Sequence, residues 1–448
     1  MLVIIIYIEK DICYNNLRLM KVIKMNISEY LSKFFYGTKD PSLKAMHYFM
    51  DMYNNFDKEM KFIHVAGTNG KGSCVEMLNN ILIQAGYRVG KYISPYLIKY
   101  NEIISINNRD ITDKEMEELI KELDPKIKEY EEKYKVNLTL FELKTIIALL
   151  YFYRKDVDIV ILETGLGGRY DCTNIIHKPI VSIITSIGYD HMNLLGNTLL
   201  EIALEKAGII KEGSNTVCFS QEEDVNKVIV DTCKNKHNTL YMLDKKDIIN
   251  YRYDSEYLYF DYQEYHDVAV NLKGKAQVRN ALICLKTIDI LKENGFVISI
   301  DAVKLGLSSV IHHGRMEVIH KNPLIIYDGA HNEPAIKNLQ ESINMYYKNI
   351  PHIYIISILK RKDHKKMLEL LSSDKEATFI FTSGNDTDEY TDKDILAKEA
   401  LNYIDSKNII SLDLFEALKY VKNKKDIVSF VIGSFYVYKD VVEAINKL

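Results

Sequence analysis

The fold of this chain is decided by Lys61–Ser73, which reads KFIHVAGTNGKGS. Its first half is a short apolar run typical of a buried strand, and its second half is rich in glycine. A helical pattern follows from about Gly72 to Gln84 and ends at Gly86. A glycine-rich turn between a strand and a helix lets backbone N–H groups surround phosphate oxygens at the positive end of the helix. The stretch therefore predicts a phosphate loop and a bound nucleoside triphosphate.

The side chains of this loop are the first candidate binding residues. Lys71 can reach the terminal phosphates, and the Ser73 hydroxyl can approach a magnesium ion. Gly72 separates these two residues, so the spacing departs from the usual GxxxxGK[ST] pattern. The alternative is a glycine-rich turn that binds nothing. The candidate nucleotide-binding set is Thr68, Asn69, Gly70, Lys71, Gly72 and Ser73.

Continuous apolar runs elsewhere predict an α/β protein. Residues 158–162 and 180–184 are typical of parallel strands buried on both faces. Residues 251–262 alternate about a turn and predict a hairpin. A second series of strands is expected at 324–327, 353–356, 378–381 and 427–432, with helical patterns between them. We expect two successive α/β domains joined around residues 296–314.

Composition excludes several classes of protein. The chain has 448 residues, which predicts two to three domains. With 58 Lys and Arg against 62 Asp and Glu, the net charge is −4, which argues against nucleic-acid binding through bulk positive charge. No apolar run is long enough to predict a membrane span. The six Cys, in no CxxC spacing, favour free thiols in a reducing cytoplasm. Residues 1–24 precede a more ordinary start at Met25, and we expect them to be a dispensable extension.

Polar residues follow the predicted strands. Glu163 ends one strand and precedes three glycines, so its carboxylate is placed to hold Mg²⁺ against phosphates; the alternative is a solvated loop residue. His191 follows the next strand, where a surface or packing histidine is the plainer interpretation. Helical spacing alone favours a solvated Lys206. In the second half, Asp328–Asn332 follows a strand and Gly314–Arg315 precedes it, and both can meet a nucleotide.

Taken in order, these motifs resemble the bacterial folylpolyglutamate synthase/dihydrofolate synthase family, relatives of the Mur ligases. The motifs are Gly67–Ser73, Glu163–Asn174, Asp190–His191, Glu205–Ile209 and Asp328–Asn332. The resemblance implies a Mur-ligase-like fold, with a P-loop-containing N-terminal α/β domain and a smaller Rossmann-like C-terminal α/β domain. The expected boundaries are residues 1–24 for an extension, 25–310 for the ATP- and folate-binding domain, and 311–448 for the glutamate ligase domain.

The resemblance also implies roles for single residues. The Mg²⁺ ligands would be Ser94, Glu163 and His191, with Lys206 as a carbamate. Asn280, Arg315 and Asp328 match positions that contact ATP, with His331 nearby. Phe141, Glu142 and Asp171–Asn174 match the region that receives the pterin, which singles out Asp171, Thr173 and Asn174. The implied catalytic set is Lys71, Glu163, His191, Lys206 and His331.

The implied activity is ATP- and Mg²⁺-dependent addition of L-glutamate to a folate or dihydropteroate carboxylate through an acyl phosphate. The enzyme is expected to be a cytoplasmic monomer that binds neither nucleic acid nor membrane. One departure from the family is His312–His313, which replaces a usual Trp-Pro pair and is expected to alter packing on the adenine side.

The folate-ligase interpretation has two alternatives. A Mur ligase acting on a UDP-sugar peptide carries a UDP-binding domain of about 100 residues before the phosphate loop. Only 66 residues precede Gly67, or 66 − 24 = 42 counted from Met25, which is too short. A P-loop ATPase or nucleotide-binding regulator that makes no amide bond would not need Lys206 or the Asp328–Asn332 motif.

Overall fold

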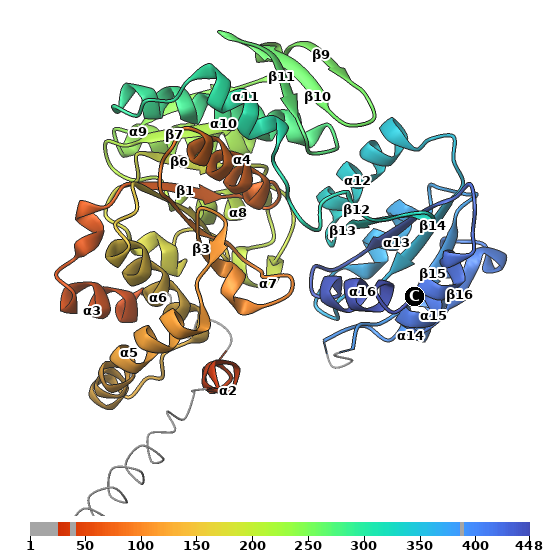
Figure 1. The fold of residues 1–448 in the computed structure, drawn as a ribbon, viewed down its shortest axis with the longest axis horizontal. Coiled ribbons are helices and arrows are strands. Elements are labelled where there is room, and N and C mark those ends of the chain that lie inside the picture. Colours follow the sequence, from red (N-terminus) through yellow and green to blue (C-terminus); the bar gives the residue numbers. More distant parts are fainter. Residues whose placement is uncertain (1–25, 36–41, 386–388) are drawn as a thin grey trace, which may run out of the picture. The chain divides into compact units, whose positions relative to one another are not determined.

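The computed structural model describes residues 26–35, 42–385 and 389–448 (Figure 1). The predicted extension at residues 1–24 lies outside the described residues. Contacts between Cα atoms divide the chain into two units, one of residues 1–39 and 112–147, the other of residues 40–111 and 148–448. Each is described by itself.

An eight-stranded sheet forms the first half of the larger unit, in the order β4-β3-β2-β5-β1-β6-β7-β8. β1 lies between β5 and β6 and is parallel to both, because all three are apolar runs that need cover on both faces. Val65 pairs with Glu163, and Ala66 pairs with Ile184, so the strands end at one edge of the sheet. The strands are β1 (Phe62–Ala66), β2 (Val89–Tyr92), β3 (Ile104–Ile106), β4 (Arg109–Asp110), β5 (Ile159–Glu163), β6 (Val181–Ile184), β7 (Asn215–Phe219) and β8 (Thr239–Leu243).

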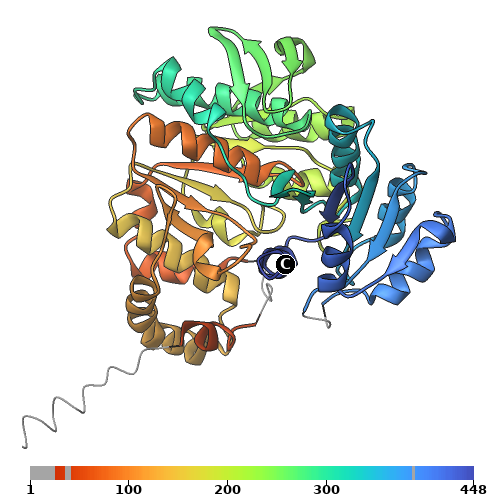
Figure 2. The same ribbon diagram turned by 45° about the vertical axis from the view of Figure 1, so that its right-hand side comes forward.

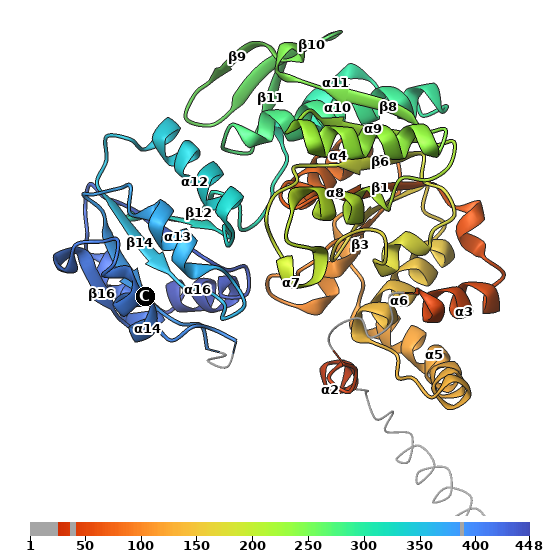
Figure 3. The same cartoon turned by 180° about the vertical axis from the view of Figure 1, so that it is seen from behind.

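Helices cover both faces of this sheet. One face packs against α4 (Lys71–Gln84) and α10 (Ala276–Glu293), and α11 (Ile300–Ser308) packs on α4 (Figure 1). The opposite face packs against α8 (Leu199–Ala207) and α9 (Glu223–Asn235), which Figure 3 shows from behind. A capping box begins α8: the Thr198 hydroxyl accepts from Glu201 N, and the Glu201 carboxylate accepts from Thr198 N. The phosphate loop thus joins the central strand to a helix anchored in the core.

The predicted hairpin is confirmed and extended by one strand. β9 (Ile249–Tyr253), β10 (Leu258–Tyr262) and β11 (Tyr265–Val270) form a three-stranded antiparallel sheet. β10 and β11 bury alternate side chains in the same core as α10, whereas β9 is exposed along its length.

The second α/β series also forms. Its six-stranded sheet lies in the blue part of the ribbon (Figures 1 and 2). The strand order is β12-β13-β17-β14-β15-β16, with strands β12 (Glu317–Lys321), β13 (Leu324–Asp328), β14 (His352–Ile356), β15 (Thr378–Phe381), β16 (Ile409–Ser411) and β17 (Val428–Ile432). One face packs against α12 (Glu333–Tyr346), α13 (His364–Leu371) and α14 (Lys393–Ala400). The other packs against α15 (Leu414–Lys422) and α16 (Tyr438–Ile445). All four strands predicted in this region are present.

The smaller unit is helical. It contains α2 (Ile27–Leu31), α5 (Asp113–Tyr134) and the first half of α6 (Leu140–Arg154). The Tyr30 hydroxyl donates to Asp124 at 2.8 Å and joins α2 to α5. The remaining helical segments among the described residues are α3 (Lys44–Met52), η1 (Phe56–Glu59), η2 (Tyr100–Ile103), η3 (Cys172–Ile175), α7 (Met192–Leu195), η4 (Lys245–Asp247) and η5 (Ser406–Asn408). Within the described ranges, no helix combines the length and apolarity needed to cross a membrane.

Candidate active site

The phosphate loop has a backbone that only glycine accommodates at two points. A Cβ on Gly67 would lie 1.7 Å from Thr185 Oγ1, and one on Gly70 would lie 2.7 Å from Asn280 Oδ1. Gly70 also has φ +94°, a left-handed conformation that other residues rarely adopt. The loop is therefore held between β6 and α10 at van der Waals distance, with its N–H groups at the N-terminus of α4.

Hydrogen bonds tie this loop to the segment after β6. Thr68 N donates to Ser186 O at 2.7 Å, and Thr68 Oγ1 donates to Gly188 O at 3.0 Å. The Ser186 hydroxyl donates to Asn69 O at 3.0 Å. These hydrogen bonds fix the backbone of the phosphate loop against the segment that follows β6.

Lys71 and Glu163 meet beside the loop. Lys71 Nζ donates to Gly67 O at 3.1 Å and lies 3.8 Å from Glu163 Oε1. Glu163 is only 5% exposed, and burial raises the pKa of its carboxyl to about 7 although Lys71 and the Ser94 N–H oppose the shift. The structure therefore brings together Ser94, Glu163 and Lys71. The positive charge near the Glu163 carboxylate is too small to offset the effect of its burial.

Lys206 is buried, so the expectation of a solvated side chain is wrong. It is 4% exposed, and its ammonium donates to Gly67 O at 2.9 Å. Helical spacing misled because α8 packs tightly here: a Cβ on Gly168 would lie 2.8 Å from Lys206 O. Burial, reinforced by the charge of Lys71, lowers the pKa of Lys206 to about 7. The amine is therefore poised to be neutral near physiological pH.

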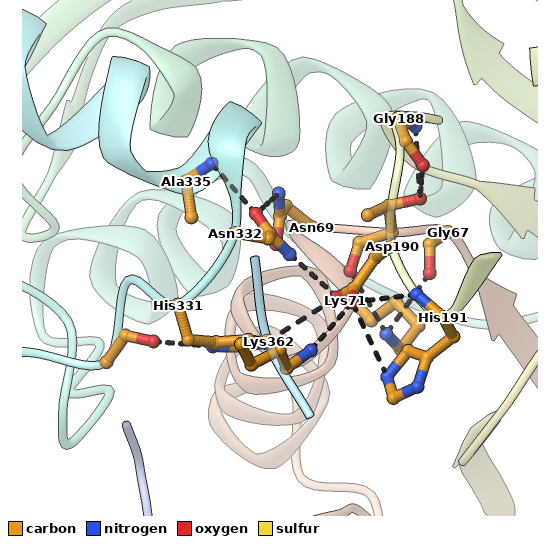
Figure 4. A network of polar contacts seen from close by, with 12 residues as sticks. Gly67, Asn69, Lys71, Gly188, Asp190, His191, His331, Asn332, Ala335 and Lys362 are labelled. Carbon is orange, nitrogen blue, oxygen red and sulfur yellow. Dashed lines mark hydrogen bonds and ion pairs between the residues drawn. The ribbon is translucent and has the colours of Figure 1, made fainter. Parts of the chain in front are cut away.

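Asp190 is the centre of a polar network that joins the two sheets (Figure 4). Its carboxylate accepts from Lys362 Nζ at 2.6 Å and from Asn332 Nδ2 at 2.8 Å. Asn69 of the phosphate loop donates to Asn332 Oδ1 at 3.0 Å. Burial disfavours the charge of Asp190, but the hydrogen bond with His331 and the Lys362 ammonium hold its pKa well below its usual range. The sequence motifs include Asp190 and Asn332 but give neither an individual role, and no local pattern shows that they meet each other or Lys362.

The two predicted histidines lie on either side of Asp190. His191 Nε2 is 3.8 Å from Asp190 Oδ1, and His331 Nε2 is 3.7 Å from Asp190 Oδ2. Burial lowers the pKa of His191 to about 4 and also lowers that of His331. His331 Nδ1 donates to Gly329 O at 2.7 Å. In the part of the chain that the structure describes, no three His, Cys, Asp or Glu side chains form a metal-binding group.

One pocket brings together most of the predicted nucleotide-binding residues. It is lined by Asn69, Gly70, Asn280, Arg315 and Asp328, which come from both sheets. Asp328 accepts hydrogen bonds from Met316 N and Ala330 N and attracts Arg315, whose guanidinium lies 4.5 Å from the centre of the Phe435 ring. Gln277 and Asn338 also line the pocket. Nothing in their local sequence distinguishes them from ordinary helix residues.

Hydrogen bonds among residues 166–174 hold the Asp171–Asn174 segment in place. Asp171 accepts from Leu166 N at 2.8 Å and from the Thr173 hydroxyl at 2.5 Å. Thr173 Oγ1 lies 2.8 Å from Nε2 of His64, which is a fully buried residue of β1. No sequence pattern distinguishes His64 from its apolar neighbours. Asn174 Nδ2 donates to Arg169 O at 3.0 Å. Asp171 and Thr173 thus support the glycine-rich loop after β5.

Phe141 and Glu142 belong to the other unit, which is described by itself. They lie in the first turn of α6, in the smaller unit. The Glu142 carboxylate accepts from Thr139 N at 2.8 Å and from the Thr139 hydroxyl at 2.7 Å, which caps the helix.

Comparison with known proteins identifies the architecture. Residues 65–288 match the Mur ligase middle domain, and residues 314–441 match the Mur ligase glutamate ligase domain. The chain is 35% identical to a dihydrofolate synthase/folylpolyglutamate synthase of Bacillus subtilis over 421 residues, which cover 91% of this chain and 95% of the relative. The predicted two-part Mur-ligase-like α/β fold is confirmed.

Solved structures agree with this assignment. A folylpolyglutamate synthase of Thermotoga maritima has a TM-score of 0.80 at 29% identity, covering 94% of this chain and 96% of that one. Escherichia coli FolC, solved with DHPP and ADP, has a TM-score of 0.80 at 27% identity, with the same coverages of 94% and 96%. This chain therefore belongs to the dihydrofolate synthase/folylpolyglutamate synthase family of Mur ligases.

Proposed function

We propose that this chain is an ATP-dependent ligase that adds L-glutamate to a pterin or folate carboxylate through an acyl phosphate. The reaction would be tetrahydrofolate polyglutamylation, conversion of dihydropteroate to dihydrofolate, or both. The observation that carries the proposal is the link from the phosphate loop through Asn69 to Asn332, beside a pocket lined from both sheets. ATP bound there would have its phosphates at the N-terminus of α4 and its base toward Asn280, with Arg315 and Asp328 alongside.

The candidate metal ligands fit Mg²⁺ in their chemistry. The Ser94 hydroxyl and the Glu163 carboxylate are hard oxygen donors, and the lowered pKa of His191 keeps its imidazole neutral. The buried Glu163 carboxylate, with its pKa near 7, would gain from a bound cation. When bound, Mg²⁺ would neutralise charge on the phosphoryl group being transferred. We propose Ser94, Glu163 and His191 as its ligands.

Lys206 would complete this set as a carbamate. Its amine, with a pKa of about 7, is substantially neutral at physiological pH. The nitrogen can then attack the carbon of CO₂ and lose a proton, which converts a cation into an anionic oxygen ligand. The same step would relieve the repulsion between Lys206 and Lys71.

The remaining residues act on the substrates. A carboxylate is a poor electrophile, and accepting the γ-phosphoryl group of ATP gives it a leaving group. Lys71 would neutralise charge during that transfer. The amine of L-glutamate then attacks the acyl carbon, the bond to phosphate breaks, and the amine loses a proton. We propose His331 as the residue that assists this step, with Nδ1 donating to Gly329 O and Nε2 facing the Asp190 carboxylate at 3.7 Å.

We propose that the pterin meets the segments that contain Phe141, Glu142 and Asp171–Asn174. Asp171 and Thr173 would act by holding the glycine-rich loop in shape, since their side chains already bond to each other and to the loop. We also propose the domain boundaries 25–310 and 311–448, with residues 1–24 as an extension, and a monomeric enzyme of the cytoplasm.

The decisive experiment compares acceptors. The full chain is incubated with ATP, Mg²⁺ and L-glutamate, with either dihydropteroate or tetrahydrofolate, and phosphate release and the glutamylated product are measured. Acceptor-dependent phosphate release that matches product formation is expected with at least one acceptor. Phosphate release that is independent of both acceptors would instead favour an ATPase, and Glu163→Ala and Lys71→Ala serve as inactive controls.

A further inference from the structure

His312 lies against the phosphate loop and the first turn of α4. Its Nδ1 is 3.1 Å from Ser73 Oγ. A Cβ built on Gly72 would lie 3.0 Å from both Cε1 and Nε2 of His312 and 3.7 Å from Glu163 Oε2. The free edge of the imidazole therefore covers the first turn of α4, on the side where the Glu163 carboxylate lies.

The surroundings of His312 favour one protonation state and one tautomer of its imidazole. Burial and the nearby cations Arg315 and Lys91 disfavour a positive charge, so the ring is neutral and carries one N–H. Nε2 has no hydrogen-bond partner among the described residues. A lone pair at Nε2 would face the Glu163 carboxylate and incoming phosphate oxygens, whereas an N–H there would be attracted to both.

With the proton on Nε2, Nδ1 becomes an acceptor. The Ser73 hydroxyl then donates its proton to Nδ1, which fixes the hydroxyl rotor and turns the oxygen lone pairs away from the ring. The phosphate loop would thereby receive a positioned hydroxyl and one extra donor, from a segment that joins the two sheets.

We propose that His312 is a further nucleotide-binding residue, which orients the Ser73 hydroxyl through Nδ1 and donates from Nε2 to an oxygen of the ATP triphosphate. The proposal rests on ATP binding at this loop and is independent of which carboxylate is glutamylated. It predicts that His312 distinguishes nucleotides by their phosphates and not by their base.

The test is equilibrium binding of ATP and of AMP to the full chain, measured by titration calorimetry without folate or glutamate. A hydrogen bond to a charged group is worth enough that His312→Phe should weaken ATP binding about ten- to a hundredfold. AMP binding should change by less than about twofold. His313→Asn is the matched control, because His313 pairs with Glu317 and its side chain is 61% exposed.

Two near-isosteric variants separate the roles of the two nitrogens. His312→Gln can place a donor near the Nε2 position, and His312→Asn can place only a group near Nδ1. ATP binding should be better retained by His312→Gln. Equal ATP affinity in wild type and His312→Phe would overturn the proposal, as would a parallel loss of ATP and AMP binding, which would indicate base packing. If His312→Phe does not fold, better ATP binding by His312→Asn than by His312→Gln would overturn it.

Discussion

Asp190 and Lys362 form a 2.6 Å ion pair across 172 residues of sequence, with side chains only 11% and 8% exposed. Asp190 follows the first sheet, and Lys362 lies between β14 and α13 of the second. A buried pair gains little over apolar packing, but loss of one partner leaves an uncompensated charge. The pair therefore makes the joining of the two sheets sensitive to a single side chain.

Lys362→Met should destabilise the protein by about 3 kcal/mol, because it leaves Asp190 buried without its main counter-charge. It should also lower kcat/KM, since Asp190 lies within reach of both His191 and His331. Urea unfolding and steady-state kinetics measure the two effects. Arg361→Met is the control: Arg361 pairs with Glu389 at an exposed site, worth at most about 1 kcal/mol. Equal effects of the two substitutions would contradict this view.

Gly70→Ala should weaken ATP binding at least about tenfold, because left-handed backbone costs other residues about 1–2 kcal/mol and the new Cβ would meet Asn280 Oδ1 at 2.7 Å. Calorimetric titration with ATP measures the loss. Gly86→Ala shares the strain, with φ +88°, but its Cβ would meet nothing within 4 Å. The control should lose stability and keep its ATP affinity. A comparable loss of affinity in both variants would show that the Asn280 contact is unimportant.

Lys206 should take up CO₂ in a pH-dependent way. With a pKa of about 7, its amine is neutral above that pH and protonated below it, so the carbamate should be lost as the pH falls through 7. Carbon NMR after incubation with ¹³C-bicarbonate would detect the carbamate, and Lys206→Ala should abolish the signal. Lys211→Met should leave it, although the pKa of Lys211 is also lowered, to about 8. A signal that survives Lys206→Ala would refute the assignment.

The second sheet should lose stability as the pH rises above 6.5, the ordinary pKa of His352. His352 Nδ1 lies 2.6 Å from Asp374 Oδ2 and Nε2 lies 3.0 Å from Tyr347 O, so the imidazolium can donate twice. Burial opposes the charge, but these bonds raise the pKa of His352 above 6.5. Its contribution is complete below 6.5 and is lost as the pH passes the raised value.

The slope of the free energy of unfolding between pH 6 and 8 measures this contribution. His352→Phe should flatten the slope. His237→Phe should not, because the His237–Glu212 pair is 82% and 70% exposed and worth little. An unchanged slope in His352→Phe would contradict the role of this pair.

The phosphate loop, the strands that flank it and the family could all be predicted from the sequence. These features depend on local patterns: apolar runs, glycines at a strand–helix turn, and motifs in a fixed order. Lys71 beside Glu163 was also predictable, since β1 and β5 are both continuous apolar runs and parallel strands end at one edge of the sheet.

The burial of Lys206 and the contacts between residues far apart in the sequence became visible only in the three-dimensional structure. Helical spacing placed Lys206 in solvent, but packing of α8 against the phosphate loop buried it. Three contacts join residues more than 170 positions apart: Asp190 with Lys362, Asn69 with Asn332, and His312 with Ser73. Periodicity reports the environment of a residue relative to its own helix or strand. Which distant side chain completes a charge or a hydrogen bond depends on how whole layers pack, and no local pattern records it.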